Sequence, residues 1–304
     1  MTYSGRYFAL TLWNVSEASE VKILVISGSR ADYGLLEWPL KLLREAFDTD
    51  LLRIWGQEFP VAFENVSAYL AEKRPDLMLI LGDRYEILAA ATAAHLLRVP
   101  IAHIAGGDVT EGSYDDAMRD AISRMASIHF VTSTSAMARL SHMGYRNIHL
   151  VGNPGIDYIR NADWKRERSI TEPYVVVSYQ AETIEREFGA GQSIGRMFAD
   201  LPADIKKVFI RPNPDYGSVL VNSIIDGYEK VIDVIYDFLP HAEFLNLIFH
   251  CEEFIGNSSS MLYEAPELGV KTRMIGKRQR GRTIPFGDGY ASQRIVNILR
   301  YASL

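Results

Sequence analysis

Short apolar runs alternate with longer amphipathic segments along most of this chain. The first half contains four such runs, each followed by a stretch whose apolar residues have helical spacing: VKILVIS (21–27), DLMLILG (76–82), PIAHIAGG (100–107) and IHFVTS (128–133). Continuous apolar and β-branched runs of this length are typical of strands buried on both faces, and their alternation with helices is typical of parallel sheets. The pattern predicts a doubly wound α/β domain.

The same alternation resumes after residues 158–173, a polar and charged segment broken by Pro173. Four more apolar runs follow, with helical patterns between them: YVVVSY (174–179), KKVFIRP (206–212), EEFIG (252–256) and KTRMIG (271–276). We therefore expect two Rossmann-like domains that face each other across a cleft, at residues 21–157 and 174–304, joined by a linker at 158–173. Residues 1–20 are an N-terminal extension of unknown role, and the last helix is a candidate to pack back on the first domain.

Composition excludes some classes of function. The chain has 304 residues with 32 basic and 38 acidic side chains, so its net charge of −6 argues against a nucleic-acid partner. It contains one cysteine, Cys251, in an apolar context that indicates a structural thiol and a reducing compartment. No apolar run reaches the roughly 20 residues that span a bilayer, and residues 1–20 lack the features of a signal peptide. We expect a cytoplasmic protein with no membrane partner.

Polar clusters follow the predicted strands. Ligands of doubly wound sheets bind beyond the carboxyl ends of the strands, so these clusters should meet at one cleft. Five clusters have this position: GSRADYG (28–34), GDRYE (82–86), AGGDVTEGSYDD (105–116), RPNPDYG (211–217) and GNSSS (256–260). Their convergence indicates an enzyme or a ligand-binding protein.

Three of the clusters, and one further loop, have side chains suited to an anion. The serine turn is either a helix N-cap or a phosphate site at a helix N-terminus. Arg30, on a predicted turn, is either a solvated arginine or a contact for a diphosphate. Arg211 and Asn213 lie at a rigid, proline-flanked strand exit. The loop GKRQRGR (276–282) is either a solvated basic loop or, as we favour in an acidic protein, a second anion contact; it contains Arg278, Gln279, Arg280 and Arg282.

The remaining two clusters supply carboxylates. Asp83 follows a strand directly and can cap the next helix or act as a base. The longer cluster and the helix after it contain Asp108, Glu111, Asp115, Asp116 and Arg119. We favour a helix-cap role for either Asp115 or Asp116. Carboxylates that share a cleft should have pKa values pushed apart, which gives one base and one acid.

Other motifs point away from cofactors. His103 lies in an apolar strand and is interpreted as a packed core residue. No Cys/His spacing typical of zinc is present, so we predict no metal. The glycine spacings of dinucleotide and P-loop sites are absent as well.

Taken together, these stretches resemble the UDP-N-acetylglucosamine 2-epimerases. They are most similar to the hydrolysing branch, which makes free N-acetylmannosamine or related 2-epimerised sugars for sialic-acid-like (nonulosonic) acids. The matching pieces occur in family order between Val21 and Arg282: SGSRADYGLL, ILGDRYEILAAATAAHLLRVPIAHIAGGDVTEGSYDDAMRDAIS, VGNPGID, IGNSSSMLYEAPELGV and IGKRQRGR. The resemblance implies the glycosyltransferase-B architecture, a nucleotide-sugar substrate, no cofactor and a homodimer.

The resemblance also implies a role for each matched position. Arg30 would contact the diphosphate, and Glu264 would accept hydrogen bonds from the ribose hydroxyls. The turn formed by Asn257, Ser258, Ser259 and Ser260 would hold phosphate. Asp83, with Asp115 or Asp116, would handle the proton at sugar C2, and the arginines of the 276–282 loop would line the cleft. The implied reaction is elimination of the nucleoside diphosphate followed by hydration, with UDP or GDP and the exact sugar left open.

Two positions differ from the family pattern. Relatives usually carry a histidine–proline pair where this chain has Gln180 and Ala181, and glutamine cannot shuttle a proton. The stretch between Leu51 and Pro75 is also shorter than in relatives. Two alternatives therefore stay open: a nucleotide-sugar-binding homologue with impaired catalysis, and a glycosyltransferase of the same architecture.

Overall fold

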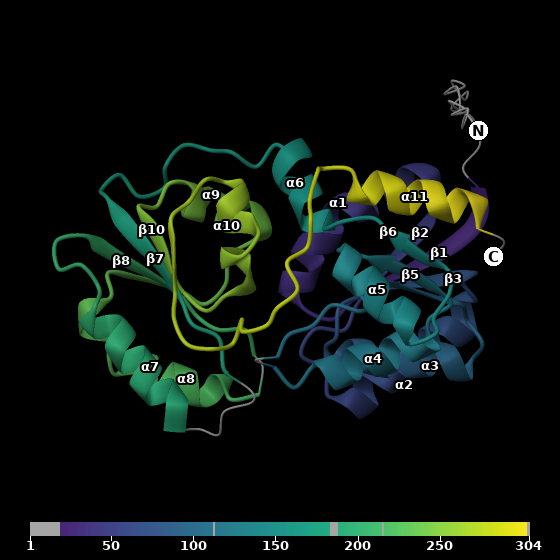
Figure 1. The fold of residues 1–304 in the computed structure, drawn as a ribbon, viewed down its shortest axis with the longest axis horizontal. Helices are drawn as coiled ribbons and strands as arrows, with labels where there is room; N and C mark the ends of the chain where they lie inside the picture. The colour runs from purple at the N-terminus through teal and green to yellow at the C-terminus, as the bar shows by residue number, and fades with distance from the viewer. Residues whose placement is uncertain (1–18, 112, 183–187, 215, 303–304) are drawn as a thin grey trace, which may run out of the picture.

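The computed structural model describes residues 19–111, 113–182, 188–214 and 216–302. Residues 1–18 of the expected N-terminal extension lie outside this part, and the first strand begins at Ser19. Two sheets lie side by side, each covered by helices on both faces (Figure 1). Within each sheet, every strand pairing of the described residues is parallel, which confirms the predicted doubly wound α/β architecture.

The first sheet has six strands within the described residues, in the order β2-β1-β3-β4-β5-β6. Their bounds are Ser19–Ser27 (β1), Phe47–Arg53 (β2), Leu77–Leu81 (β3), Ile101–Ile104 (β4), Ile128–Val131 (β5) and Ile148–Leu150 (β6). The strand β2 was not predicted. It lies at the edge of the sheet, and its sequence FDTDLLR alternates between buried and more exposed positions instead of forming a continuous apolar run.

Helices on the two faces of this sheet bury separate cores. Side chains of β1 alternate between them, so that Ile23 and Val25 face one core while Leu24 and Ile26 face the other. The first half of the chain contributes α1 (Arg30–Ala46), α2 (Phe59–Lys73), α3 (Tyr85–Leu96), α4 (Asp116–Met125), α5 (Thr134–His142) and α6 (Pro154–Asn161). None of the helices in the described ranges is both long and apolar enough to cross a membrane.

The second sheet has five strands in the described part of the chain, in the order β11-β10-β7-β8-β9. Their bounds are Tyr174–Ser178 (β7), Lys206–Ile210 (β8), Val234–Tyr236 (β9), Glu253–Gly256 (β10) and Thr272–Met274 (β11). The edge strand β9 is three residues long and was also not predicted. The helical elements here are α7 (Phe188–Ala199), α8 (Ser218–Asp226), η1 (Glu229–Val231), α9 (His241–Phe249), η2 (Ser259–Met261) and α10 (Glu264–Glu267).

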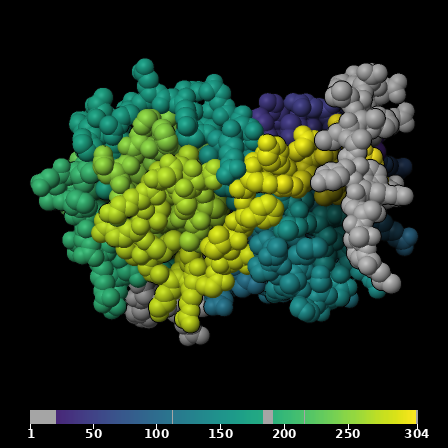
Figure 2. Space-filling model, turned by 45° about the horizontal axis from the view of Figure 1, so that its top comes forward, coloured from purple at the N-terminus to yellow at the C-terminus, as the bar shows by residue number. Residues whose placement is uncertain are grey.

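Each sheet with its covering helices forms one lobe, and the chain passes between the two lobes twice (Figure 1). The first passage begins with α6, which takes in residues 158–161 of the expected linker, and Trp164 of that linker is buried in the core beneath the second sheet. The second passage is the segment 276–290, after which α11 (Ala291–Tyr301) packs on α1 and buries Ile295 and Leu299 in the first core. Figure 2 shows this yellow C-terminal segment running across both lobes.

Candidate active site

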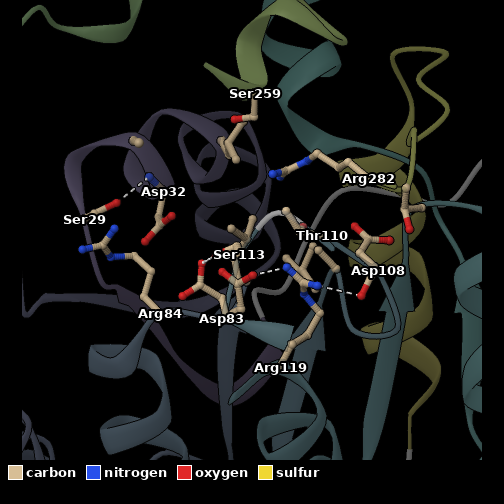
Figure 3. Close-up of a pocket in the computed structure, with 18 of the residues that line it drawn as sticks. Ser29, Asp32, Asp83, Arg84, Asp108, Thr110, Ser113, Arg119, Ser259 and Arg282 are labelled. Atoms are coloured by element: carbon tan, nitrogen blue, oxygen red, sulfur yellow. Dashed lines mark hydrogen bonds and ion pairs between the residues drawn. The ribbon is translucent and has the colours of Figure 1, made fainter. Parts of the chain in front are cut away.

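The carboxyl ends of the strands in the two sheets face each other and form one pocket. The first lobe lines it with the turn after β1 and the exits of β3, β4 and β5. The second lobe adds Asn213, Ser259, Tyr263, Arg278 and Arg282. Polar clusters that the sequence places far apart are therefore brought to one place, and Figure 3 shows their side chains pointing into it.

The centre of this pocket is an ion-paired cluster around Arg119. This arginine extends from α4, its side chain is 4% exposed, and its guanidinium pairs with both Asp83 and Asp116. It also donates to the backbone carbonyl of Asp108 at 2.6 Å. A buried guanidinium needs such partners, because an unpaired charge in the interior is costly. The cluster therefore holds in place the side chain of Asp83, which lines the pocket, and that of the adjacent Asp116.

The expectation that Asp115 or Asp116 caps α4 is wrong. Asp115 occupies the N-cap position, but its side chain makes no cap hydrogen bond and instead accepts from the Ser113 hydroxyl. Asp116, in the first turn, accepts from the backbone N–H of Thr110 at 3.0 Å and pairs with Arg119. Both carboxylates are thus used for contacts at the pocket and not for the helix end.

Asp108 lies just beyond β4, and both of its carboxyl oxygens accept from the Thr132 hydroxyl, at 2.8 and 3.0 Å. Burial raises the pKa of Asp108 to about 6, although the Thr132 hydrogen bond and the charges of Arg119 and Arg282 oppose the rise. A carboxyl group with this pKa is mostly ionised at neutral pH and is more basic than an ordinary aspartate. Asp108 is therefore suited to act as a general base.

Sequence reasoning missed Asp32, a further carboxyl group in this pocket. Ser29 caps α1 by accepting from the Asp32 backbone N–H at 3.1 Å, so Asp32 lies in the first helical turn and lines the pocket. Burial raises the pKa of Asp32 to about 7, although the positive charge of Arg84 lowers it. The spacing of Ser29 and Asp32 resembles a capping box. This pattern would have predicted that α1 begins directly after Ser29 and that Asp32 lies in its first turn.

A second pocket adjoins the first and shares Ala31, Leu35, Asn213, Ser259 and Tyr263 with it. Arg30 lies here as the first residue of α1 and not on the turn that was expected, and its guanidinium is 4.3 Å from the Phe238 ring centre. Glu264 is buried, and its Oε1 lies 2.9 Å from Nε2 of His241. The pocket thus combines an exposed cation, an aromatic face and a buried carboxylate.

The serine turn lies at the junction of these two pockets. The single helix expected after it is replaced by the short η2 and the four-residue α10, which Pro266 and Gly269 keep short. Ser258 caps η2 through a bond from the Ser260 backbone N–H at 3.3 Å. Ser258, Ser259 and Ser260 all line the second pocket. The hydroxyl groups are therefore available at the place where the two pockets meet.

Asn257 and Gln180 connect the ends of β10 and β7. The buried Asn257 side chain accepts from the Gln180 backbone N–H at 2.6 Å and donates to its carbonyl at 2.9 Å. The Gln180 side chain donates to the Ser178 hydroxyl at 3.2 Å and accepts from the Asn213 backbone N–H at 2.9 Å. Both side chains hold strand ends and loops in place.

The basic residues divide into two groups. Arg278 and Arg282 line the first pocket. Between them, the Gln279 side chain accepts a hydrogen bond from Arg282 at 3.2 Å and donates one to the Asn257 carbonyl at 2.7 Å. Arg211 is engaged by carboxylates of its own lobe, Asp226 at 2.8 Å and Asp237 at 3.1 Å.

Glu111 and Arg280 are predicted site residues that lie outside both pockets. Both side chains are mostly exposed, and they approach to 4.0 Å at the rim, where neither is part of the lining of the two pockets. The structure therefore does not bring these two together with the other predicted residues.

Two other groups have structural roles. His103 is buried between the Gly82 carbonyl and the Ser123 hydroxyl, at 2.7 and 3.1 Å. The Cys251 thiol donates to the Ile248 carbonyl at 3.1 Å, and burial raises its pKa to about 12, which keeps the thiol protonated at neutral pH. Among the described residues, no three or more His, Cys, Asp or Glu side chains come together in a way that could hold a metal ion.

Comparisons with known proteins identify the family of this chain. The family model for UDP-N-acetylglucosamine 2-epimerase matches residues 61–284. A UDP-N,N'-diacetylbacillosamine 2-epimerase (hydrolyzing) of Legionella pneumophila is 29% identical, over 86% of this chain and 82% of that protein. A GDP/UDP-N,N'-diacetylbacillosamine 2-epimerase (hydrolyzing) of Campylobacter jejuni is 28% identical, over 73% of this chain and 62% of that protein.

A solved structure shows the same fold. The UDP-GlcNAc 2-epimerase of Methanocaldococcus jannaschii, in complex with UDP-GlcNAc and UDP, has a TM-score of 0.76 at 17% identity, covering 93% of this chain and 100% of that chain. The expected glycosyltransferase-B architecture and the resemblance to the hydrolysing branch are both confirmed. The chain belongs to the UDP-N-acetylglucosamine 2-epimerase family.

Proposed function

We propose that this protein is a hydrolysing 2-epimerase of a nucleotide-linked 2-acetamido sugar. Its substrate would be UDP-N-acetylglucosamine or a related UDP- or GDP-linked sugar, and its products the free 2-epimer, of the N-acetylmannosamine type, and a nucleoside diphosphate. One observation carries this proposal. The carboxyl of Asp108, with its raised pKa, shares a pocket with Arg282 and with the Asp83–Arg119 ion pair.

This combination suits an elimination. The hydrogen at sugar C2 is only weakly acidic, so its removal needs a positioned base and simultaneous departure of a good leaving group from C1. Asp108 supplies the base, and nearby arginines stabilise the negative charge that develops on the leaving diphosphate. Protonation of C2 from the other face and addition of water at C1 then give the free 2-epimer.

The adjoining pocket is suited to the nucleotide. Arg30 and the hydroxyl groups of Ser258, Ser259 and Ser260 would contact the diphosphate, since charge-assisted and hydroxyl hydrogen bonds both suit phosphate oxygens. Glu264, held by His241, would accept hydrogen bonds from the ribose hydroxyls. The diphosphate would then lie at the shared wall of the two pockets, with the sugar facing Asp108.

The sugar pocket also has an apolar side. Leu81, Ile104 and Met118 are part of its lining, beside the charged cluster. Such side chains favour a sugar that presents a methyl group over one with only hydroxyl groups. The two bacterial relatives named above are diacetylbacillosamine epimerases, so a diacetamido sugar belongs in any set of trial substrates.

The test is incubation of the full chain with UDP-N-acetylglucosamine, UDP-N,N'-diacetylbacillosamine and the GDP-linked counterpart, without any acceptor. We expect release of nucleoside diphosphate from one of them, together with free 2-epimer identified by NMR. Binding of the nucleotide sugars with no release from any would indicate the catalytically impaired homologue. Release that requires an added sugar acceptor would indicate a glycosyltransferase.

A further inference from the structure

Asp32 is a pocket carboxyl group to which the elimination assigns no task. It lies in the first turn of α1, fixed at its backbone by the Ser29 cap, and it lines the same pocket as Asp83 and Asp108. Its Oδ2 atom is buried and has no hydrogen-bond partner. A buried oxygen without a partner is costly in any group and much more costly in an ionised one. This geometry favours the neutral carboxylic acid at Asp32.

The charges that face Asp32 do not remove this preference. Arg84 follows β3 and favours the ionised form of Asp32, but its guanidinium also donates to the buried carboxylate of Glu86 at 3.2 Å. Asp83 and Glu86 both oppose ionisation of Asp32. The balance leaves the pKa of Asp32 at about 7, with burial as the largest cause. Asp32 therefore holds a proton for a substantial fraction of the time at neutral pH.

Asp32 and Asp108 come from different walls of the pocket. Asp32 extends from α1 after β1, whereas Asp108 follows β4 and contacts Thr132. In Figure 3 they lie on either side of the Asp83–Arg119 pair. A sugar ring above that pair would present its two faces to these two carboxyl groups. Inversion at C2 requires a base on one face and an acid on the other.

We propose that Asp32 is the acid that protonates sugar C2, on the face opposite to Asp108; this rests on the proposed function. In the first step the Asp108 carboxylate takes the C2 proton. The electron pair of that C–H bond forms the C1=C2 double bond, and the C1–O bond breaks with its pair leaving on the diphosphate. The proton on Asp108 then passes to the diphosphate or to solvent.

In the second step the O–H of Asp32 gives its proton to C2 of the unsaturated sugar. The electrons of the double bond form the new C2–H bond, and a water oxygen bonds to the cationic C1. One proton of that water returns to the Asp32 carboxylate, so both carboxyl groups regain their starting states. The assignment gives Asp83 a different task, which is to hold Arg119 in place through their ion pair.

The experiment compares two products of the same reaction, the nucleoside diphosphate and the free 2-epimer. In Asp32→Asn the amide keeps the size of the side chain but cannot give a proton to carbon. We expect nucleoside diphosphate release to stay within about tenfold of wild type, while the free 2-epimer falls by about 10²–10⁴-fold and the 1,2-unsaturated sugar accumulates. In Asp108→Asn, release and epimer formation should fall together.

Two outcomes overturn the inference. One is that folded Asp32→Asn forms the 2-epimer and the diphosphate in the wild-type ratio. The other is that it binds UDP but loses release and epimer formation equally, which would place Asp32 in the first step. Thermal melting with and without UDP monitors folding. If the asparagine variant does not fold, Asp32→Glu is tested in its place. A ratio of unsaturated sugar to epimer that is unchanged in Asp32→Glu would reject the role of Asp32.

Failure of the proposed function would look different. In that case wild type itself would release no nucleoside diphosphate from any of the trial sugars, and the role of Asp32 would fall with it. If wild type reacts and only the product ratio of the Asp32 variants stays unchanged, the function stands and the inference alone is wrong.

Discussion

Asp83 and Arg119, 36 residues apart in the sequence, form an ion pair at the base of the pocket. Asp83 comes directly after β3, and Arg119 extends from α4 with its side chain almost fully buried. Asp116 pairs with the same guanidinium. Two carboxylates and one arginine thus form a fixed group. Removal of one member should displace the other two side chains while the fold of the protein is kept.

The first prediction follows from this group. Asp83→Asn removes one of the two charges that hold Arg119, while Asp116 keeps the guanidinium paired. We expect turnover to fall by up to about 10²-fold, because Arg119 loses part of its positioning, with UDP affinity within about threefold of wild type. Steady-state kinetics and UDP titration measure the two effects. The matched control is Asp120→Asn, which breaks an ion pair with Arg139 outside the pocket and should change neither quantity. Normal turnover in Asp83→Asn would remove Asp83 from the mechanism.

The second prediction concerns the nucleotide. UDP or GDP should raise the melting temperature of the wild-type protein by mass action. Glu264→Ala removes the carboxylate beside His241 and should reduce that rise strongly, corresponding to at least about tenfold weaker binding, since a hydrogen bond to a charged group contributes about 1.5–3 kcal/mol. Glu267→Ala, on the same α10 but paired with the outer Arg160, is the control and should keep the full rise. An equal rise in both variants would place the ribose elsewhere.

The third prediction concerns the pH dependence of the first step. The pKa of Asp108 is raised to about 6, and Asp108 must be ionised to accept the C2 proton. Nucleoside diphosphate release, measured as kcat/KM, should therefore increase about tenfold per pH unit below 6 and level off above it. Asp108→Asn should lose this inflection together with most of the rate. A flat profile between pH 5 and 7 in wild type would exclude Asp108 as the base.

The fourth prediction concerns stability and Asp32. Its carboxyl has a pKa of about 7 in the folded protein against 3.8 for an ordinary aspartate, so between these values the folded state binds more protons than the unfolded state. Stability must then decrease as the pH rises through this window. Asp32→Asn cannot titrate, so its melting temperature relative to wild type should increase from pH 4.5 to pH 8. A difference that is constant with pH would contradict the raised pKa, and Asp120→Asn, outside the pocket, again serves as the control.

The sequence predicted the elements that are buried on both faces, because continuous apolar runs such as VKILVIS identify them. It did not predict the edge strands β2, β6 and β9. The strand β2 alternates between buried and more exposed residues, and β6 and β9 are each only three residues long. The sequence also identified the five clusters that meet at the pocket, since strand ends in a parallel sheet share one edge.

Individual roles were harder to predict, because they depend on contacts between distant segments. Gln180 was interpreted as a weakened catalytic position, but its side chain bridges Ser178 and the Asn213 backbone. Asp32 was overlooked because GSRADYG was interpreted as a turn, whereas the helix already begins at Arg30. Whether Gln180 slows turnover, and whether the protein is a homodimer, stay predictions.

The central claim is that this pocket inverts C2 by removing one proton and adding another. Its most direct test is the wild-type reaction run in D2O on a UDP-linked 2-acetamido sugar, with the sugar product analysed by NMR. We expect free 2-epimer that carries one deuterium at C2, because the proton added to C2 exchanges with solvent through the second carboxyl group. Free sugar that keeps its original C2 configuration and its original C2 hydrogen would contradict the account, since it would show simple hydrolysis at C1.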